Sequence, residues 1–526
     1  MKSSTSVLLE KPTPRLVIDD IPKTLWAIAI VAFWERFSFW GVTVPFQNHM
    51  EHPWSSGSHE KPGVLGLGQS MATSVNCAFR ILYYVTPIIW AVVSDSWLGR
   101  YKSLCYTFIL YILGIGVLVG SSFYVAVERG FALPGLLLAM VLIALGGGGC
   151  RAIMVPFIAD QYVNREPRLK TLKSGEVVIT DPVLTLEYIY SLYFWLGNLG
   201  SFSIIASTYI EMHVSFWCAY SICLGAMIIA LIILLGGRNY YSKLTAHLVQ
   251  REENILPAAT RILICAARNS FKLKRATPEY QSQLCGVSVP WSEKTVTELG
   301  RVLRTCKILL AFVVFWTCFD QMDTNLISQA SHLISGPIPN DMMTVINAAG
   351  CVVFGPIIQS GLYPILRRHN IVFKPMLKIT VGFAIIALSM GYAAIVQGLI
   401  YSASPDRISV WIQAPIYIFI AVGEIFCYVT ALEYADSHAP EGMRVLVQAI
   451  SLVIAGIGNA LAMALSPLAR DPNLIAFYGA LLGAMTATTV GFWFWFREYD
   501  NLEHSDSMIG EIEQSLEMDI EKASSM

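Results

Sequence analysis

The chain has 526 residues, of which 55% are hydrophobic and only 14% are charged, whereas soluble domains carry about 25% charged residues. With a mean hydropathy of +0.55, this composition excludes a soluble globular protein and indicates an integral membrane protein in a lipid bilayer. The formal net charge of −1 argues against a nucleic-acid partner. The eleven cysteines show no paired framework and no metal-ligand spacing, so we expect no metal and no other cofactor.

The hydropathy profile divides the chain into two groups of membrane spans. A window of ~19 residues predicts about twelve spans, at residues 24–46, 68–93, 103–126, 134–159, 186–208, 214–236, 306–329, 342–365, 375–398, 408–432, 446–467 and 474–496. We therefore expect a polar tail over residues 1–23, two six-helix bundles over residues 24–236 and 306–497, a linker over residues 237–305, and a second polar tail over residues 498–526. The first tail lacks the pattern of a cleavable signal peptide.

The loops also predict an orientation. One side of the expected membrane carries most of the loop Lys and Arg residues, including Lys170 and Lys374, whereas the other side carries few. Because cytosolic loops are enriched in these residues, we expect the first side, both termini and the linker to be cytosolic. Within the linker, residues 258–274 are expected to form an amphipathic helix on the inner membrane surface.

Charged and polar residues lie deep inside several spans. Glu35 and Arg36 are adjacent in an apolar run, where a charge costs at least ~2.5–3.5 kcal/mol unless it faces a polar environment. At 1.5 Å per residue, similar residues lie ~17–25 Å from the membrane surface on their own spans, within a core ~30 Å thick. The residues at this depth are Glu35, Arg80, Arg151, Asn198, Asp320 and Glu424. This convergence predicts one polar cavity between the two bundles.

The mixture of charges in this cavity would match a zwitterion such as a short peptide. We expect the substrate's amino group to seek Glu424 and its carboxylate to seek Arg151 or Arg80. Tyr84 and Trp316 are expected to line the cavity, although aromatic residues in spans more often serve packing.

Six short motifs occur in order on the expected spans. They are ERFSFWG at 35–41, YVTP with DSWLGRYK at 84–87 and 95–102, PFIADQ at 156–161, FWLGNLGS at 194–201, DQMDTNLISQA at 320–330, and GE with AP at 423–424 and 439–440. Together they resemble the motifs of the proton-coupled oligopeptide transporter (POT/PTR) family, in its fungal-type branch. The likeness covers nearly the whole chain. It implies an all-α membrane protein with the major facilitator superfamily fold, about 12 transmembrane helices in two six-helix bundles.

The resemblance implies a secondary active transporter rather than an enzyme. Such a protein would move di- and tripeptides or a peptide-like metabolite by alternating access, driven by protons, as a monomer in the plasma membrane. The residues expected in proton coupling and gating are Glu35, Arg36, Arg151, Asp320 and Glu424. The loop residues Asp95, Gly99 and Arg100 are expected to brace helix ends rather than to bind substrate.

Three departures from the family pattern keep alternatives open. Ala32 stands where the family has its first helix 1 glutamate, Arg151 stands where it has a lysine, and Arg80 is an added cation. Arginine cannot release its proton, so an Arg151–Asp320 pair would open by protonation of Asp320 or by exchange of partners. A more positive cavity would favour an anionic substrate. The alternatives are therefore a proton-independent transporter, an exporter of another anionic or specialised metabolite, or a sensor that binds without transport.

Three further residue types carry expectations of their own. Asp323 is expected to be solvated at the outer end of its helix, and His49 to lie in an outer loop. No histidine is expected deep in a span. Glycines 146–149 occur inside a span, so they predict close helix contact rather than a phosphate-binding loop.

Overall fold

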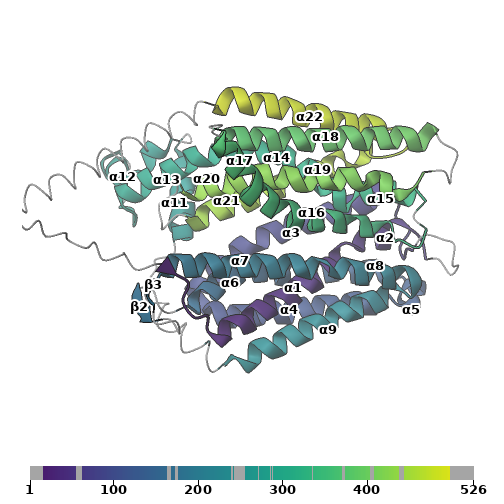
Figure 1. Cartoon of the computed structure of the whole chain (residues 1–526), viewed down its shortest axis with the longest axis horizontal. Coiled ribbons are helices and arrows are strands. Elements are labelled where there is room, and N and C mark those ends of the chain that lie inside the picture. The colour runs from purple at the N-terminus through teal and green to yellow at the C-terminus, as the bar shows by residue number, and fades with distance from the viewer. Residues whose placement is uncertain are drawn as a thin grey trace, which may run out of the picture.

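The computed structural model shows long, nearly parallel helices in two groups (Figure 1). It describes residues 16–54, 62–162, 167–171, 176–238, 241, 255–269, 272–284, 286, 288–334, 336–369, 373–402, 408–437 and 444–497. The expected tail over residues 498–526 lies outside the described residues. We call the helices before residue 237 the N-terminal half and those after residue 305 the C-terminal half.

The N-terminal half is built from apolar runs that are long enough to cross a bilayer at 1.5 Å per residue. Its helices are α1 (Lys23–Thr43), α2 (Phe46–Glu51), α3 (Gln69–Val93), α4 (Arg100–Ser121), α5 (Tyr124–Glu128), α6 (Ala132–Asp160), α7 (Pro182–Ser201), α8 (Ser203–His213) and α9 (Phe216–Gly236), with a π-helical turn η1 (Ser94–Leu98) between α3 and α4. Helix α1 packs on α7, α8 and α9, while α6 packs on α3 and α4.

The C-terminal half contains more interrupted helices. Its elements are η3 (Cys306–Ala311), α14 (Phe312–Phe319), η4 (Asp320–Asp323), α15 (Asn325–Ser331), η5 (Asp341–Thr344), α16 (Val345–Pro356), η6 (Ile357–Leu362), α17 (Tyr363–Arg368), α18 (Pro375–Ser402), η7 (Val410–Gln413), α19 (Ala414–Glu424), η8 (Ile425–Val429), α20 (Thr430–Ser437), α21 (Arg444–Leu465), η10 (Ser466–Leu468) and α22 (Leu474–Phe496). Of the turns, η6 and η8 are π-helical, and the other η elements are 3-10 helices. The halves meet where α3 packs on α21, α7 on α16, and α8 on η5.

Most of the expected membrane spans are present as apolar helices. Ten helices in the described residues are long and apolar enough to cross a membrane, and an eleventh candidate is the bent pair Glu293–Leu303 and Cys306–Ser331. The remaining expected span, residues 186–208, is covered by α7 and α8, which are separated at Phe202. The first span continues beyond its expected end at residue 46 and reaches Glu51.

The two ends of the helices differ. One end carries a small sheet in the order β1-β3-β2, made of β1 (Leu16–Val17), β2 (Arg168–Thr171) and β3 (Val177–Thr180). We call it the hairpin end, and the opposite end, which carries α2, the α2 end (Figure 1). Lys170 on β2 contacts the carboxylates of Asp19 at 3.7 Å and Asp20 at 2.6 Å. The hydrogen bond to Asp20 raises the pKa of Lys170.

The linker contributes four helical segments at the hairpin end (Figure 1). They are α11 (Ile255–Arg268), η2 (Leu273–Ala276), α12 (Pro278–Leu284) and α13 (Glu293–Thr305). The amphipathic helix expected over residues 258–274 corresponds to α11, which ends at Arg268 and packs on α13 and α21. Its residues Ala259, Ile262 and Ala266 are buried in these contacts, so its apolar face covers protein.

Glycines 146–149 pack closely against neighbouring helices, as expected. A Cβ atom on Gly148 would lie 1.9 Å from Oγ1 of Thr86, and one on Gly146 would lie 2.7 Å from the carbonyl oxygen of Thr107. The glycines therefore let α6 approach α3 and α4 within the span, which leaves no room for a phosphate loop.

Candidate functional site

A break in the seventh expected span presents two carboxylates on one side. Helix α14 ends at Phe319, and the 3-10 turn η4 follows before α15. In a 3-10 helix the side chains at positions i and i+3 eclipse each other, so Asp320 and Asp323 point the same way. Both are fully buried, at 0% exposure. The expectation that Asp323 is solvated at a helix end was therefore wrong.

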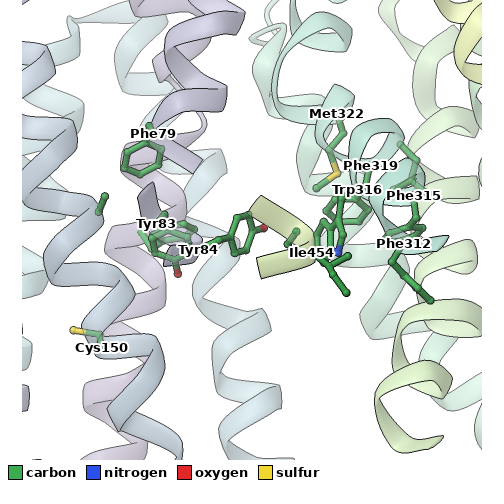
Figure 2. Close-up of a cluster of buried hydrophobic side chains, with 14 of the residues drawn as sticks. Phe79, Tyr83, Tyr84, Cys150, Phe312, Phe315, Trp316, Phe319, Met322 and Ile454 are labelled. Carbon is green, nitrogen blue, oxygen red and sulfur yellow. The ribbon is translucent and has the colours of Figure 1, made fainter. Parts of the chain in front are cut away.

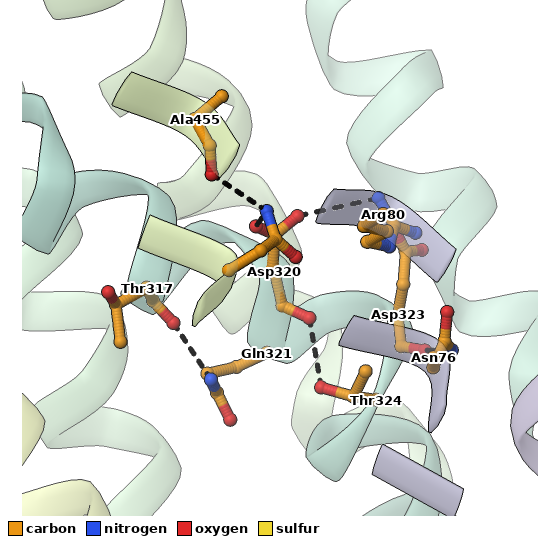
Figure 3. Close-up of polar contacts among 9 residues, drawn as sticks. Asn76, Arg80, Thr317, Asp320, Gln321, Asp323, Thr324 and Ala455 are labelled. Atoms are coloured by element: carbon orange, nitrogen blue, oxygen red, sulfur yellow. Dashed lines mark hydrogen bonds and ion pairs between the residues drawn. The ribbon is translucent and has the colours of Figure 1, made fainter. Parts of the chain in front are cut away.

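Arg80 on α3 bridges these two carboxylates (Figure 3). Its Nη1 lies 3.4 Å from Oδ1 of Asp320, and its Nη2 lies 2.6 Å from Oδ2 of Asp323. The other Asp320 oxygen accepts a hydrogen bond of 2.6 Å from Nδ2 of Asn459, and Nδ2 of Asn76 donates to the carbonyl oxygen of Asp323 at 3.2 Å. We call Arg80, Asp320 and Asp323 the buried triad, which joins the two halves.

The buried triad changes two expectations about charge. The contact expected between Arg151 and Asp320 is not formed, because Arg80 occupies that carboxylate. Arg80 also adds no net positive charge to the site, since two carboxylates face it. A buried cation of this kind is stable only when its partners remain in place. The triad therefore couples the position of α3 to that of η4.

A second pair of charges lies within the N-terminal half. Nε of Arg36 is 3.1 Å from Oε2 of Glu35, and both residues are on α1. Helix α7 packs closely here, because a Cβ atom on Gly200 would lie 2.8 Å from Cβ of Arg36. This contact explains Gly200 of the FWLGNLGS motif. It places the half-buried Asn198 on the helix that adjoins this pair.

Arg151 lies on aromatic rings rather than on a carboxylate. Its guanidinium carbon is 5.8 Å from the ring centroid of Tyr83 and 5.4 Å from that of Tyr84, within the range of cation–π attraction. Among the described residues no carboxylate lies within 4.0 Å of it. Arg151 is partly exposed in mid-span and therefore offers an unpaired positive charge between the halves.

Aromatic rings of the two halves meet where Tyr84 of α3 approaches Trp316 of α14 (Figure 2). The ring of Tyr84 is 5.8 Å from that of Trp316, which is 5.2 Å from that of Tyr428. Tyr84 and Trp316 are each 5% exposed. The two residues expected to line a cavity therefore meet at the interface of the halves.

Glu424 is the corresponding negative charge of the C-terminal half. It ends α19 directly before the π-helical turn η8, an irregularity that often marks functional sites. Its Oε2 accepts a weak hydrogen bond of 3.7 Å from Sγ of Cys351. In the part of the chain that is described, no Lys or Arg lies within 4.0 Å of Glu424. Arg151 and Glu424 are thus uncompensated charges of opposite sign, one in each half.

Arg100, which follows the turn after α3, connects the start of α4 to the end of α6. Nη1 of Arg100 lies 2.7 Å and 2.8 Å from the two carboxylate oxygens of Asp160, at the end of α6. Gly99 has a φ of 76°, which only glycine adopts readily, and it lets α4 begin at Arg100. The side chain of Asp95 lies outside the described residues.

We expect Arg100→Gln to lower the free energy of unfolding by about 1.5–3 kcal/mol, because charge-assisted hydrogen bonds contribute about that much. Thermal unfolding of the purified protein measures the change, and Lys102→Gln in the same segment is the control. Coupling predicts that Arg100→Gln combined with Asp160→Asn destabilises by less than the sum of the single changes. Additive effects would contradict the proposed brace.

A polar network that the sequence did not predict joins the halves at the α2 end. Asn48 and Asn340 exchange two hydrogen bonds of 2.9 Å each. Other bonds link the same two halves: Gln47 to Ser328 at 3.3 Å, Gln69 to Asn325 at 3.0 Å, and Ser70 to the carbonyl of Ser466 at 3.0 Å. The i, i+4 spacing of Gln47 and Glu51 beyond the first span was the available signal, since it predicts one polar helix face.

The position of His49 also differs from expectation. His49 is fully buried in α2, within the first candidate span, rather than in a loop. Its Nδ1 lies 3.3 Å from the hydroxyl of Tyr220 on α9, and its ring packs on Phe216. His49 lies two residues from the end of this candidate span, so it does not contradict the expectation that no histidine lies deep in a span.

Two helical halves with buried charges at their interface define a membrane transporter of the major facilitator superfamily fold. The family profile described as the POT family matches residues 101–481. A peptide transporter of Candidozyma auris is 35% identical over 512 residues, covering 94% of this chain and 87% of the relative. A peptide transporter of Saccharomyces cerevisiae is 33% identical over 508 residues, covering 94% and 82%. The chain therefore belongs to the POT family.

Solved structures share the fold. The crystal structure of an auto-inhibited POT family peptide transporter matches with a TM-score of 0.70 and 17% identity, covering 91% of this chain and 97% of that one. At this identity the match concerns the arrangement of helices, and it agrees with the expected superfamily.

Proposed function

We propose that this protein is a proton-coupled transporter of small peptides or peptide-like metabolites that works by alternating access. The relatives named above are peptide transporters. The single observation that carries the proposal is the buried triad, because it connects the two halves through groups that a proton can neutralise. In an alternating-access fold, the halves rock about a site near the bilayer midplane.

The substrate would bind between Arg151 and Glu424. A short peptide carries a carboxylate and an amino group, which are complementary to these two uncompensated charges. Tyr84 and Trp316 would contact the side chains of the peptide, and Asn198 would supply a further polar group. We assign Arg80 to the gate rather than to the substrate, since both carboxylates of the triad are bound to it.

Proton coupling would act through Asp320. Protonation of this carboxyl removes its attraction to Arg80, which loosens the contact between α3 and η4. Glu35 and Arg36 would contribute to the same coupling, since Nε of Arg36 lies 3.1 Å from the Glu35 carboxylate, which a proton can neutralise. Because Ala32 stands in place of the first glutamate of the helix 1 motif, Glu35 is the acidic residue that remains in this motif.

The expected orientation places the hairpin end and both termini in the cytosol and the α2 end outside. The enrichment of loop Lys and Arg at the hairpin end supports this assignment. The plasma membrane is the proposed location, and one chain suffices for the mechanism. In this orientation the polar network at the α2 end closes the outer side.

Uptake of a labelled dipeptide into proteoliposomes tests the proposal. We expect accumulation that requires an inward proton gradient, and we expect Asp320→Asn to lose the gradient dependence while it retains exchange of substrate. The exposed Glu293 provides the control substitution Glu293→Gln. Dipeptide flux that equilibrates without regard to the gradient in the unmodified protein would refute proton coupling. Absence of any dipeptide flux would refute the substrate class.

A further inference from the structure

Two carboxyl groups face each other across the halves at the α2 end, apart from the buried triad. Glu211 lies near the end of α8, and Asp341 begins η5, which packs on α8. Glu211 is 3% exposed and Asp341 is 0% exposed. Their carboxyl groups lie within hydrogen-bonding reach of each other. Two carboxylates in contact cannot form a hydrogen bond unless one of them carries a proton.

Three of the four carboxyl oxygens of this pair have no hydrogen-bond donor beside them in the described part of the chain. Oε1 of Glu211 accepts a hydrogen bond of 3.1 Å from Nδ2 of Asn48. Its Oε2 and both Asp341 carboxyl oxygens receive no hydrogen bond from any donor among the described residues. The backbone N–H of Met342 does not serve them, because it donates to the carbonyl oxygen of Pro339 at 3.3 Å. A single proton held between the two carboxyl groups would therefore supply the hydrogen bond that these oxygens lack.

Nothing positively charged offsets a second negative charge here. Within the described ranges, no Lys, Arg or His nitrogen lies within 4.0 Å of either carboxyl. The other titratable groups that face the pair are tyrosines, Tyr220 of α9 toward both acids and Tyr417 of α19 toward Asp341. His49 of α2 is connected to the two carboxyl groups only indirectly, through its contact with Tyr220. Like charges held together without a cation favour a single shared proton.

We propose that Glu211 and Asp341 form a second proton-binding site, in which one shared proton holds the α2 end closed. The proton sits between the N-terminal and the C-terminal half, beside the Asn48–Asn340 bonds. When α8 and η5 separate, each carboxyl meets water and ionises independently, so opening releases the proton. The gating role rests on the alternating-access function proposed above, whereas the proton site itself does not.

Infrared spectroscopy of the purified full-length protein tests the site directly. A protonated carboxyl has a C=O stretching band that a carboxylate lacks. We expect a buried carboxyl band at neutral pH that is lost in both Glu211→Gln and Asp341→Asn, because each substitution removes the need for the shared proton. Two variants are used because either one alone could fail to fold. Glu128→Gln, an exposed glutamate on α5 at the same end, should leave the band unchanged.

The outcomes separate the site from the transport function. Loss of the same band in Glu211→Gln and Asp341→Asn, but not in Glu128→Gln, supports the shared proton even if no dipeptide uptake is found. Identical spectra for all four proteins would overturn it. A band that is absent in sodium buffer and appears in choline buffer would also overturn it, because a bound cation would then occupy the position of the proton.

The gating role has its own readout. Hydrogen exchange of the amides in α8 and η5, corrected for the intrinsic effect of pH, should quicken in the unmodified protein as the pH rises through the band's titration. In Glu211→Gln the amide donates permanently to Asp341, so this pH dependence should disappear. Retained pH dependence in Glu211→Gln would restrict the proposal to a proton site and would refute its role in closure.

Discussion

Arg80→Met abolishes uptake and lowers the free energy of unfolding by about 3–5 kcal/mol, the range measured when one partner of a buried ion pair is removed. The reason is that Asp320 and Asp323, both fully buried, are left without their cation. Methionine keeps much of the side-chain volume, so packing loss contributes little. Proteoliposome uptake and thermal unfolding in detergent measure the two effects.

A double-mutant comparison isolates the electrostatic cause. Adding Asp323→Asn to Arg80→Met removes one of the stranded charges and should recover part of the lost stability. Arg129→Met, at an exposed loop position, should be close to neutral. If the double variant is no more stable than Arg80→Met alone, the destabilisation comes from packing and the triad has been misread.

Gly148→Ala is expected to have the second large effect, a loss of about 3 kcal/mol at the upper end of the range for overpacking. The new Cβ would lie 1.9 Å from Oγ1 of Thr86 and 3.0 Å from the carbonyl oxygen of Tyr83. Thr86 cannot simply rotate away, because its hydroxyl donates to the carbonyl oxygen of Ala144 at 2.8 Å. Helices α3 and α6 must therefore separate, which displaces Tyr83 and Tyr84 beneath Arg151. Uptake should fall with stability.

The matched control is Gly225→Ala in the interior of α9. Apart from the local backbone of α9 itself, no atom of the described residues lies within 4 Å of the position that its Cβ would take. Since alanine is favoured over glycine in a helix by roughly 0.5–1 kcal/mol, this variant should be neutral or slightly more stable. Equal effects of the two substitutions would mean that helix propensity, rather than the α3–α6 contact, governs the response.

The expected helices agree closely with the structure because apolar length is a local property. Hydropathy requires no knowledge of neighbours, so most spans were placed within a few residues of their observed bounds. Counting 1.5 Å per residue also placed Arg80 and Asp320 on their separate spans at depths that let them meet. The sequence therefore predicted two helical halves with charged residues between them.

The errors arose where backbone geometry or tertiary contact decides the outcome. Asp323 was placed at a solvated helix end because the sequence does not reveal the 3-10 turn that brings it beside Asp320. Arg151 was paired with Asp320 because charge sign alone cannot choose between two arginines on different helices. His49 was placed in a loop because a hydropathy window cannot detect the contact with Tyr220 of α9 that buries its ring.

The buried triad also has a consequence for biosynthesis. Arg80 and Asp320 are separated by 240 residues, so a ribosome that adds about 5–20 residues per second needs roughly 10–50 seconds to make the second after the first. During that interval the nascent N-terminal half holds an arginine whose acidic partners do not yet exist. Arg80 can form its ion pairs only after the C-terminal half has been synthesised. The packing of α3 in the N-terminal half is therefore completed late, once η4 is in place.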